Sequence, residues 1–115
     1  MLNSSLIDWE QLDMIADGFS PDFVEIYQEY LAETPDLFLQ LRHNLAANDA
    51  VASAKTAHQI KGSSGNFGFI GVSQPMAKLE VESKGGSLAG AQAWLTEAES
   101  AFQQAAVEVK TKRGA

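Results

Sequence analysis

The segment AHQIKGSSGNFG, residues 57–68, collects glycine, hydroxyl and cationic side chains inside a helical pattern of apolar residues. On a helix at about 100° per residue, His58 shares a face with Lys55 and Lys61, whereas Ile60 lies on the opposite face. The two lysines form a basic spot in an otherwise acidic protein. Glycine inside a helix costs about 1 kcal/mol relative to alanine. We therefore interpret the segment as a helix that is weakened where a partner must approach its backbone.

This central helix is expected to run from about residue 50 to residue 66. Asp49 can cap its first turn, and the glycines that follow the helix can end it. The next helix is expected to begin around Val72 or Ser73. Pro75 fits that helix only if it lies in the first turn, because proline lacks the amide hydrogen that an interior helical bond needs.

Two helical segments precede the central one. Ser20 and Pro21 are a good N-cap and N1 pair for the longer of them. Pro35 interrupts its apolar stripe, which predicts a kink or a break that roughly keeps the direction, because the stripe continues in phase. Ser4 and Ser5 can cap a short first helix.

The last helical segment shows heptad-like spacing and is expected to end in a frayed tail at about residues 110–115. Its apolar positions are Leu88, Ala91, Leu95, Ala98, Phe102, Ala105 and Val109.

These segments predict an all-α protein, an up-down-up-down four-helix bundle with a short additional N-terminal helix. Short connections favour antiparallel neighbours, and no stretch alternates with a period of two for long enough to be a strand. The length of 115 residues, without internal repeat or linker, predicts a single domain over residues 1–115. A monomer is expected, because the apolar stripes can close on one another.

Composition restricts the classes of function. The net charge of −7 disfavours nucleic acid as a partner, because phosphate backbones bind cationic surfaces. The absence of cysteine excludes disulfides, thiolate nucleophiles and thiolate metal sites. The chain shows neither a run of about 18 apolar residues nor a signal peptide, so no membrane association and a cytoplasmic location are expected.

Three kinds of site are disfavoured by the residues themselves. No metal is expected, because His43 and His58 stand far apart and the Glu-x-x-His pairs of bundle metal sites are missing. The segment GSSGNFGFIG lacks the Gly-Lys-Ser/Thr ending of a nucleotide loop and does not follow a strand. Ser63 and Ser64 lie on the far side of the helix from His58, so a Ser-His-acid nucleophile is not expected.

The remaining candidate is His58 as the nucleophile itself. A neutral imidazole can attack phosphorus without a separate base. Lys61, one turn on, could neutralise a bound phosphoryl group, and Gly62, at i+4, removes a side chain that would crowd the ring. A single histidine on a helix more often has a structural role. The hypothesis therefore depends on His58, Lys61 and Gly62 occurring together.

That pattern resembles the histidine phosphotransfer (HPt) domain pattern AHxLKGSSxxxGxxxLxxxCxxLE. The matching positions are Ala57, His58, Lys61, Gly62, Ser63, Ser64, Gly68, Leu79 and Glu80, with conservative replacements at Ile60, Val72 and Met76. Phe69 stands where a small residue is commoner, and Pro75 is unexpected inside the following helix. These two departures concern the local geometry after the motif and not the chemistry of the histidine.

The resemblance implies that His58 accepts and passes on a phosphoryl group, with electrostatic help from Lys61 and access provided by Gly62. Three further residues are implied to shape the helix and its end: Ser63, Ser64 and Gly68. The implied function is a relay between receiver-domain aspartates in a two-component phosphorelay. The implied partners are receiver domains of response regulators or of a hybrid sensor histidine kinase. Because Mg²⁺ is expected on the receiver and the phosphoryl group arrives activated, the chain is expected to be a carrier without its own cofactor or ATP site, and not an enzyme.

A partner is expected to dock on a modest apolar patch beside His58. The candidates are Ile15, Phe19, Tyr27 and Gly65, and for each large apolar residue core packing is an equally good explanation. The alternative function is a non-catalytic helical adaptor that binds a receiver or kinase domain without phosphotransfer. A hydrolase or phosphatase is a third and weaker alternative.

Overall fold

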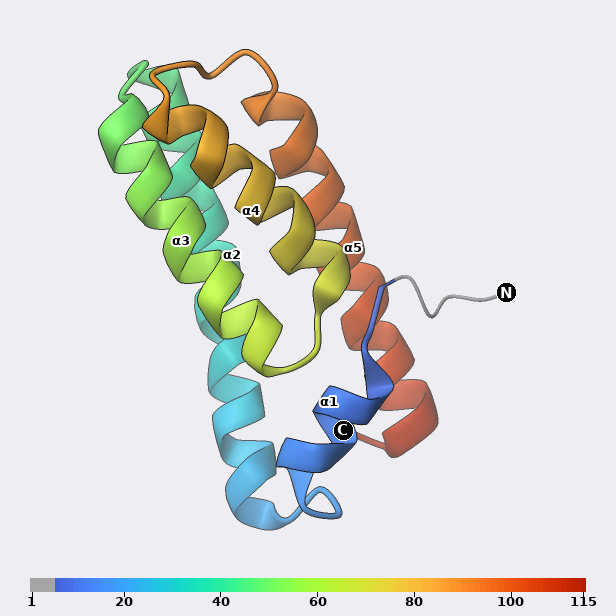
Figure 1. The fold of residues 1–115 in the computed structure, drawn as a ribbon. Coiled ribbons are helices and arrows are strands. Elements are labelled where there is room, and N and C mark those ends of the chain that lie inside the picture. The colour runs from blue at the N-terminus through green and yellow to red at the C-terminus, as the bar shows by residue number, and fades with distance from the viewer. Residues whose placement is uncertain (1–5) are drawn as a thin grey trace.

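The computed structural model describes residues 6–115, which form five helices and no strand (Figure 1). Their bounds are α1 Trp9–Ala16, α2 Pro21–Ala46, α3 Ala50–Asn66, α4 Ile70–Lys84 and α5 Ala91–Arg113. Helices α2 to α5 run alternately up and down, and α1 lies at the lower end of the bundle in Figure 1. The predicted all-α bundle with a short extra first helix is confirmed. None of the helices between residues 6 and 115 is both long and apolar enough to cross a membrane.

The N-caps of α2 and α3 are those predicted from the sequence. The Asp49 carboxylate accepts a hydrogen bond from the amide of Ala52 at 3.0 Å. The Ser20 hydroxyl accepts one from the amide of Phe23 at 3.3 Å, and Pro21 is the first residue of α2. The central helix therefore has the predicted bounds.

Both interior prolines lie within continuous helices. Helix α2 runs through Pro35 without a break, so of the two predicted alternatives, a kink or a break, the break does not occur. Helix α4 begins at Ile70, earlier than predicted, so Pro75 is its sixth residue and does not lie in the first turn. The reason for the early start is Phe69, the N-cap residue, which is fully buried. Its ring lies 5.3 Å from the ring of Tyr30, so the turn before α4 is fixed by the core.

The two ends of the described chain contact each other. Ser4 and Ser5 lie outside the described residues; Asp8 caps α1. At the other end α5 continues to Arg113, so the predicted frayed tail is wrong. The guanidinium of Arg113 donates to both carboxylate oxygens of Asp13, at 2.9 and 2.7 Å, and lies over the ring of Trp9.

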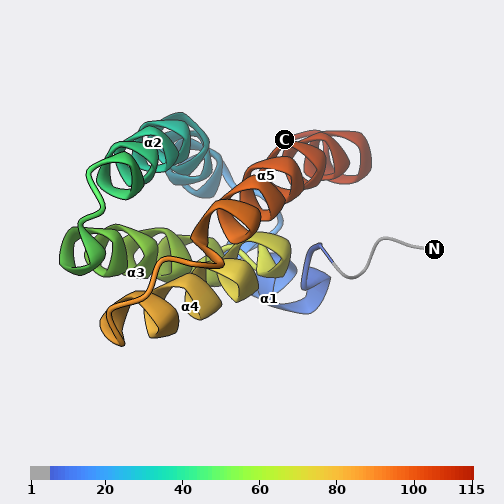
Figure 2. The same cartoon turned by 90° about the horizontal axis from the view of Figure 1, so that it is seen from above.

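Aromatic residues fill the core between the helices. In the end view of Figure 2, α2 and α5 lie on one side, and α3 and α4 lie on the other. The predicted stripe of α5 is buried except at Leu88, which is half-buried. From α3, Ile60 and Phe67 point into this core, so the opposite face of α3 is turned to solvent. The core thereby fixes which face of α3 is displayed.

Candidate functional site

His58 lies midway along α3 on the face that is turned away from the core. Its side chain is 64% exposed. Because Ile60 is fully buried on the other side of the same helix, rotation of α3 is restricted and the imidazole stays at the surface.

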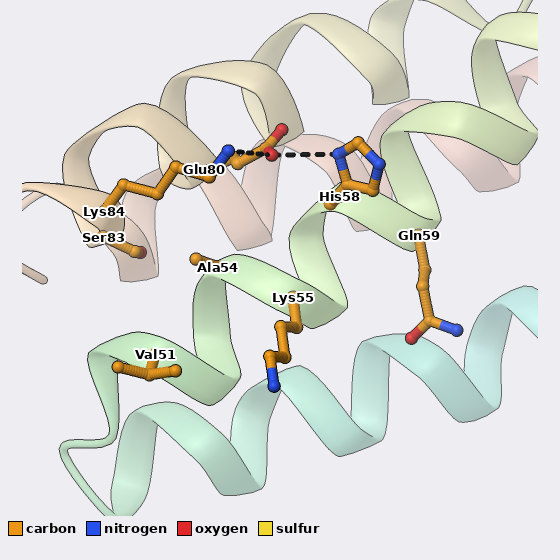
Figure 3. Close-up of a pocket in the computed structure, with 8 residues that line it drawn as sticks. All are labelled: Val51, Ala54, Lys55, His58, Gln59, Glu80, Ser83 and Lys84. Carbon is orange, nitrogen blue, oxygen red and sulfur yellow. Dashed lines mark hydrogen bonds and ion pairs between the residues drawn. The ribbon is translucent and has the colours of Figure 1, made fainter.

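Beside the imidazole lies a buried carboxylate from the neighbouring helix. Oε2 of Glu80, on α4, is 2.9 Å from Nδ1 of His58 (Figure 3). The Glu80 side chain is only 5% exposed. Its Oε1 lies 2.8 Å from Nζ of Lys61, and its Oε2 lies 3.0 Å from Nζ of Lys84. The Glu80 carboxylate therefore forms ion pairs with two ammonium groups and a hydrogen bond with the histidine.

The environment of Glu80 keeps it ionised. Burial alone would raise the pKa of its carboxyl group. Hydrogen bonds from Lys61, Lys84 and His58 outweigh burial and lower the pKa of Glu80 from 4.5 to about 2. Glu80 is therefore an anion at neutral pH.

This charge state determines where the imidazole carries its proton. A carboxylate can only accept a hydrogen bond, so a neutral His58 ring that is bonded to Glu80 has its proton on Nδ1. Its Nε2 then holds a lone pair and has no hydrogen-bond partner among residues 6–115. In Figure 3 this nitrogen lies on the side of the ring away from Glu80. In the neutral ring, the site thus presents an oriented, unprotonated nitrogen at the surface.

An open groove of about 650 Å³ runs between α3 and α4 and has His58 in its lining. Its lining residues are Val51, Ala54, Lys55, His58, Gln59, Glu80, Ser83 and Lys84. Figure 3 shows that the side chains of Lys55 and Gln59 point away from α4, toward α2. The wall on the α4 side is made by Glu80, Ser83 and Lys84.

The three motif glycines have different surroundings. Gly62 is exposed, and a Cβ built on it would meet nothing within 4 Å. A Cβ on Gly65 would lie 3.9 Å from that of Ser73, where α3 contacts α4. Gly68 has φ +76°, and a Cβ there would lie 2.6 Å from the carbonyl oxygen of Asp8. The surface at Gly62 is therefore open, and Gly68 follows the end of α3 with a positive φ.

The two motif serines face away from the imidazole. The Ser63 hydroxyl donates to the carbonyl of Gln59 at 3.1 Å. Ser64 is fully buried, and its Oγ lies 2.7 Å from the hydroxyl oxygen of Tyr30. The Ser63 hydroxyl is therefore bonded within α3, and the Ser64 hydroxyl links α3 to α2.

Comparison with known proteins places this arrangement in a family. The Hpt domain family matches residues 25–108, which include His58, its lysine and glycine neighbours and Glu80. The chain belongs to the Hpt domain family. A solved structure with the same bundle is the histidine-containing phosphotransfer protein B (HptB) from Pseudomonas aeruginosa PAO1. The two chains are 23% identical over 97% of each, with a TM-score of 0.89, a likeness that shows the fold. No curated protein matches the chain.

Within this Hpt domain, one predicted docking residue is wrong. Tyr27 is fully buried and stacks on Phe23, so it cannot meet a partner. Ile15 and Phe19 are partly buried against the core, and Phe19 lines a hollow with Arg113 near the end of the chain. Docking at Ile15, Phe19 and Gly65 stays a prediction.

No metal position is formed by the described part of the Hpt domain. Between residues 6 and 115, no three His, Asp or Glu side chains converge on a point that could hold an ion. His43 is exposed in the last turn of α2, where a cation interacts favourably with the helix dipole.

The sequence analysis assigned no role to Glu80, Lys84, Ser83 or Gln59. The sequence spacing around Phe69 is the signal that relates Glu80 to His58, because α3 and α4 form a hairpin whose turn contains Phe69. Glu80 follows Phe69 by eleven residues and His58 precedes it by eleven, so the two face each other in an antiparallel pair. That register could be assigned only after Phe69 was known to be the buried turn residue.

Proposed function

We propose that this Hpt domain carries a phosphoryl group on Nε2 of His58 and relays it between receiver-domain aspartates in a two-component phosphorelay. The observation that carries the proposal is the bond between Nδ1 of His58 and the anionic Glu80. It leaves an exposed Nε2 with a free lone pair, which is what nucleophilic attack on phosphorus requires.

The transfer step needs no base. The Nε2 lone pair attacks the phosphorus of a receiver aspartyl phosphate and forms an N–P bond. The P–O bond to the aspartate breaks, and its electron pair returns to the carboxylate. His58 keeps its Nδ1 proton, so the ring becomes positively charged, and the adjacent Glu80 anion stabilises that charge. Return of the phosphoryl group to another aspartate is the same step in reverse.

The surrounding residues support binding and access. Lys61 lies one turn from His58 with its side chain 36% exposed, so its ammonium can serve both Glu80 and an incoming phosphoryl group. Gly62 leaves open space beside the ring for the receiver. The partners are receiver domains of response regulators or of a hybrid sensor kinase, and Mg²⁺ belongs to the receiver. The domain is a carrier that uses phosphate already activated elsewhere.

The proposal is tested with a purified receiver domain that has been phosphorylated with radiolabelled phosphate. Wild-type protein should acquire acid-labile, alkali-stable label, and His58→Gln should acquire none. His43→Gln is the matched control, because His43 is also an exposed helical histidine, and it should label like wild type.

Other outcomes identify the alternatives. Binding of the receiver to wild type and to His58→Gln without any label would make the protein an adaptor. Free phosphate without a phosphoprotein intermediate would make it a phosphatase. Either result contradicts the phosphocarrier proposal.

A further inference from the structure

The groove between α3 and α4 has features that the transfer step does not use. Val51, at the end of the groove nearest the start of α3, is 69% exposed, whereas Ala54, which also lines the groove, is only 5% exposed. His58 lines the same groove, so a segment seated in it would lie beside the reacting nitrogen. The groove is therefore a candidate contact surface next to the site.

One wall of the groove contains an unsatisfied hydroxyl. Ser83 is 3% exposed, and its Oγ is buried without a hydrogen-bond partner among residues 6–115. Buried polar groups are normally hydrogen-bonded, so this hydroxyl is available as a donor to an oxygen atom that enters the groove. A carbonyl or carboxylate oxygen that enters the groove could accept its proton.

The lining of the groove has more cationic than anionic side chains. Lys55 and Lys84 line it together with the single carboxylate of Glu80, and the Lys84 side chain is 67% exposed. A hollow on the other side of α3 has the opposite sign of charge, because Glu33 and Asp36 line it. An acidic segment is thus attracted to the α4 side of His58 and repelled from the α2 side.

We propose that the α3/α4 groove is a docking site for a segment of the receiver domain that carries an aliphatic side chain next to a carboxylate. This inference rests on the proposed function and adds which side of His58 the receiver contacts. The aliphatic group packs on Val51, and the acidic group meets Lys84 and the Ser83 hydroxyl. The groove thereby favours receiver domains that present such a segment over receiver domains that lack it.

Two exposed valines provide a matched test. Val51 lines the groove, whereas Val81 is 73% exposed on α4 and does not line it. Val51→Glu places a carboxylate in the second position of α3, where the helix dipole tolerates it, so folding is retained. With a purified receiver that exchanges phosphate with the protein, Val51→Glu should raise KM about tenfold with little change in kcat, and Val81→Glu should stay within about twofold of wild type.

Ser83→Ala provides an independent readout. Because it removes a buried hydroxyl that has no partner in the free domain, Tm should be unchanged or higher. The same variant should raise KM for the receiver about threefold or more. A purely structural role for Ser83 would not produce improved stability together with weaker receiver binding.

Labelling by phosphoramidate, a small phosphodonor that needs no docking, separates the two proposals. Val51→Glu should label at the wild-type rate with this donor. If the receiver labels wild type but Val51→Glu behaves like Val81→Glu, or Ser83→Ala leaves KM unchanged, the docking site is wrong and the proposed function stands. If neither donor labels His58, the proposed function itself fails. If wild type sediments as a dimer that Val51→Glu dissociates, the groove binds a second copy and the receiver inference is wrong.

Discussion

Glu80 is the residue on which the protonation state of the site depends. It is buried, yet it remains ionised because three donors converge on it. Its carboxylate holds the proton of a neutral His58 ring on Nδ1 and, in the proposed transfer step, is the counter-charge for the ring. Lys61 and Lys84 keep that carboxylate ionised and in place.

Replacing Glu80 by glutamine should disturb the imidazole without removing the nucleophile. A neutral amide can donate to Nδ1 as well as accept from it, so the His58 ring should become a mixture of tautomers. Phosphotransfer should slow by about 10- to 100-fold. ¹⁵N chemical shifts of the ring should show one dominant tautomer in wild type and a mixture in Glu80→Gln. A single unchanged tautomer in the variant would contradict this role for Glu80.

Glu80 should also make stability depend on pH. Its pKa is about 2 in the folded protein and near 4.5 when unfolded, so its contribution is complete above pH 4.5 and is lost as pH falls toward 2. Between those values wild type should lose about 3 kcal/mol more free energy of unfolding than Glu80→Gln. Urea unfolding across this range measures the difference. If the free energy of unfolding of wild type and of Glu80→Gln changed equally with pH, the Glu80 carboxylate would not be held ionised by the fold.

At the scale of the element, α3 carries His58 on its exposed face, and Gly62 and Gly68 have different structural roles in and after this helix. Gly62 lies on the open face beside His58, where a methyl group would contact nothing in the free domain. Gly68 ends the helix with a positive φ and approaches the backbone of Asp8 closely. Only the second glycine is required by the fold.

Alanine substitutions should therefore have opposite effects on stability. Gly62→Ala should stabilise the free domain by about 0.5–1 kcal/mol, because alanine is the better helix former, and should slow transfer from a receiver. Gly68→Ala should destabilise it by about 2–4 kcal/mol through strain and collision. Chemical denaturation of both variants tests the pair. Equal losses of stability would mean that Gly62 is also structural.

The register of α3 against α4 shows what could be predicted from the sequence. The bounds of α3 follow from Asp49 and the terminal glycines, which are local signals. The start of α4 and the pairing of His58 with Glu80 depend on burial of Phe69 by side chains distant in the chain. Helical periodicity alone does not distinguish Ile26 from Tyr27 as the buried residue, and only the packing shows that it is Tyr27.

At the scale of the whole molecule, the last turn of α5 holds α1 against the bundle. Arg113 pairs with Asp13 and lies 4.6 Å from the centre of the Trp9 ring. The partners are 100 residues apart, so a local pattern of lysine, arginine and glycine predicted fraying where the structure has a contact. Long-range pairs of this kind leave no periodic signal in a single sequence.

A double-mutant cycle measures this contact. Arg113→Ala and Asp13→Ala should show a coupling energy of about 0.5–1 kcal/mol at low salt, because both side chains are partly exposed. High salt should reduce the coupling. Additive effects of the two substitutions would mean that the pair does not hold the ends of the chain together.

The central claim is that Nε2 of His58 carries the phosphoryl group. The most direct measurement is a ³¹P–¹⁵N correlation spectrum of ¹⁵N-labelled protein after phosphorylation by a receiver domain. We expect phosphorus coupled to Nε2 of His58, with Nδ1 still protonated and bonded to Glu80. Phosphorus on Nδ1, on another residue, or on no residue would contradict the account.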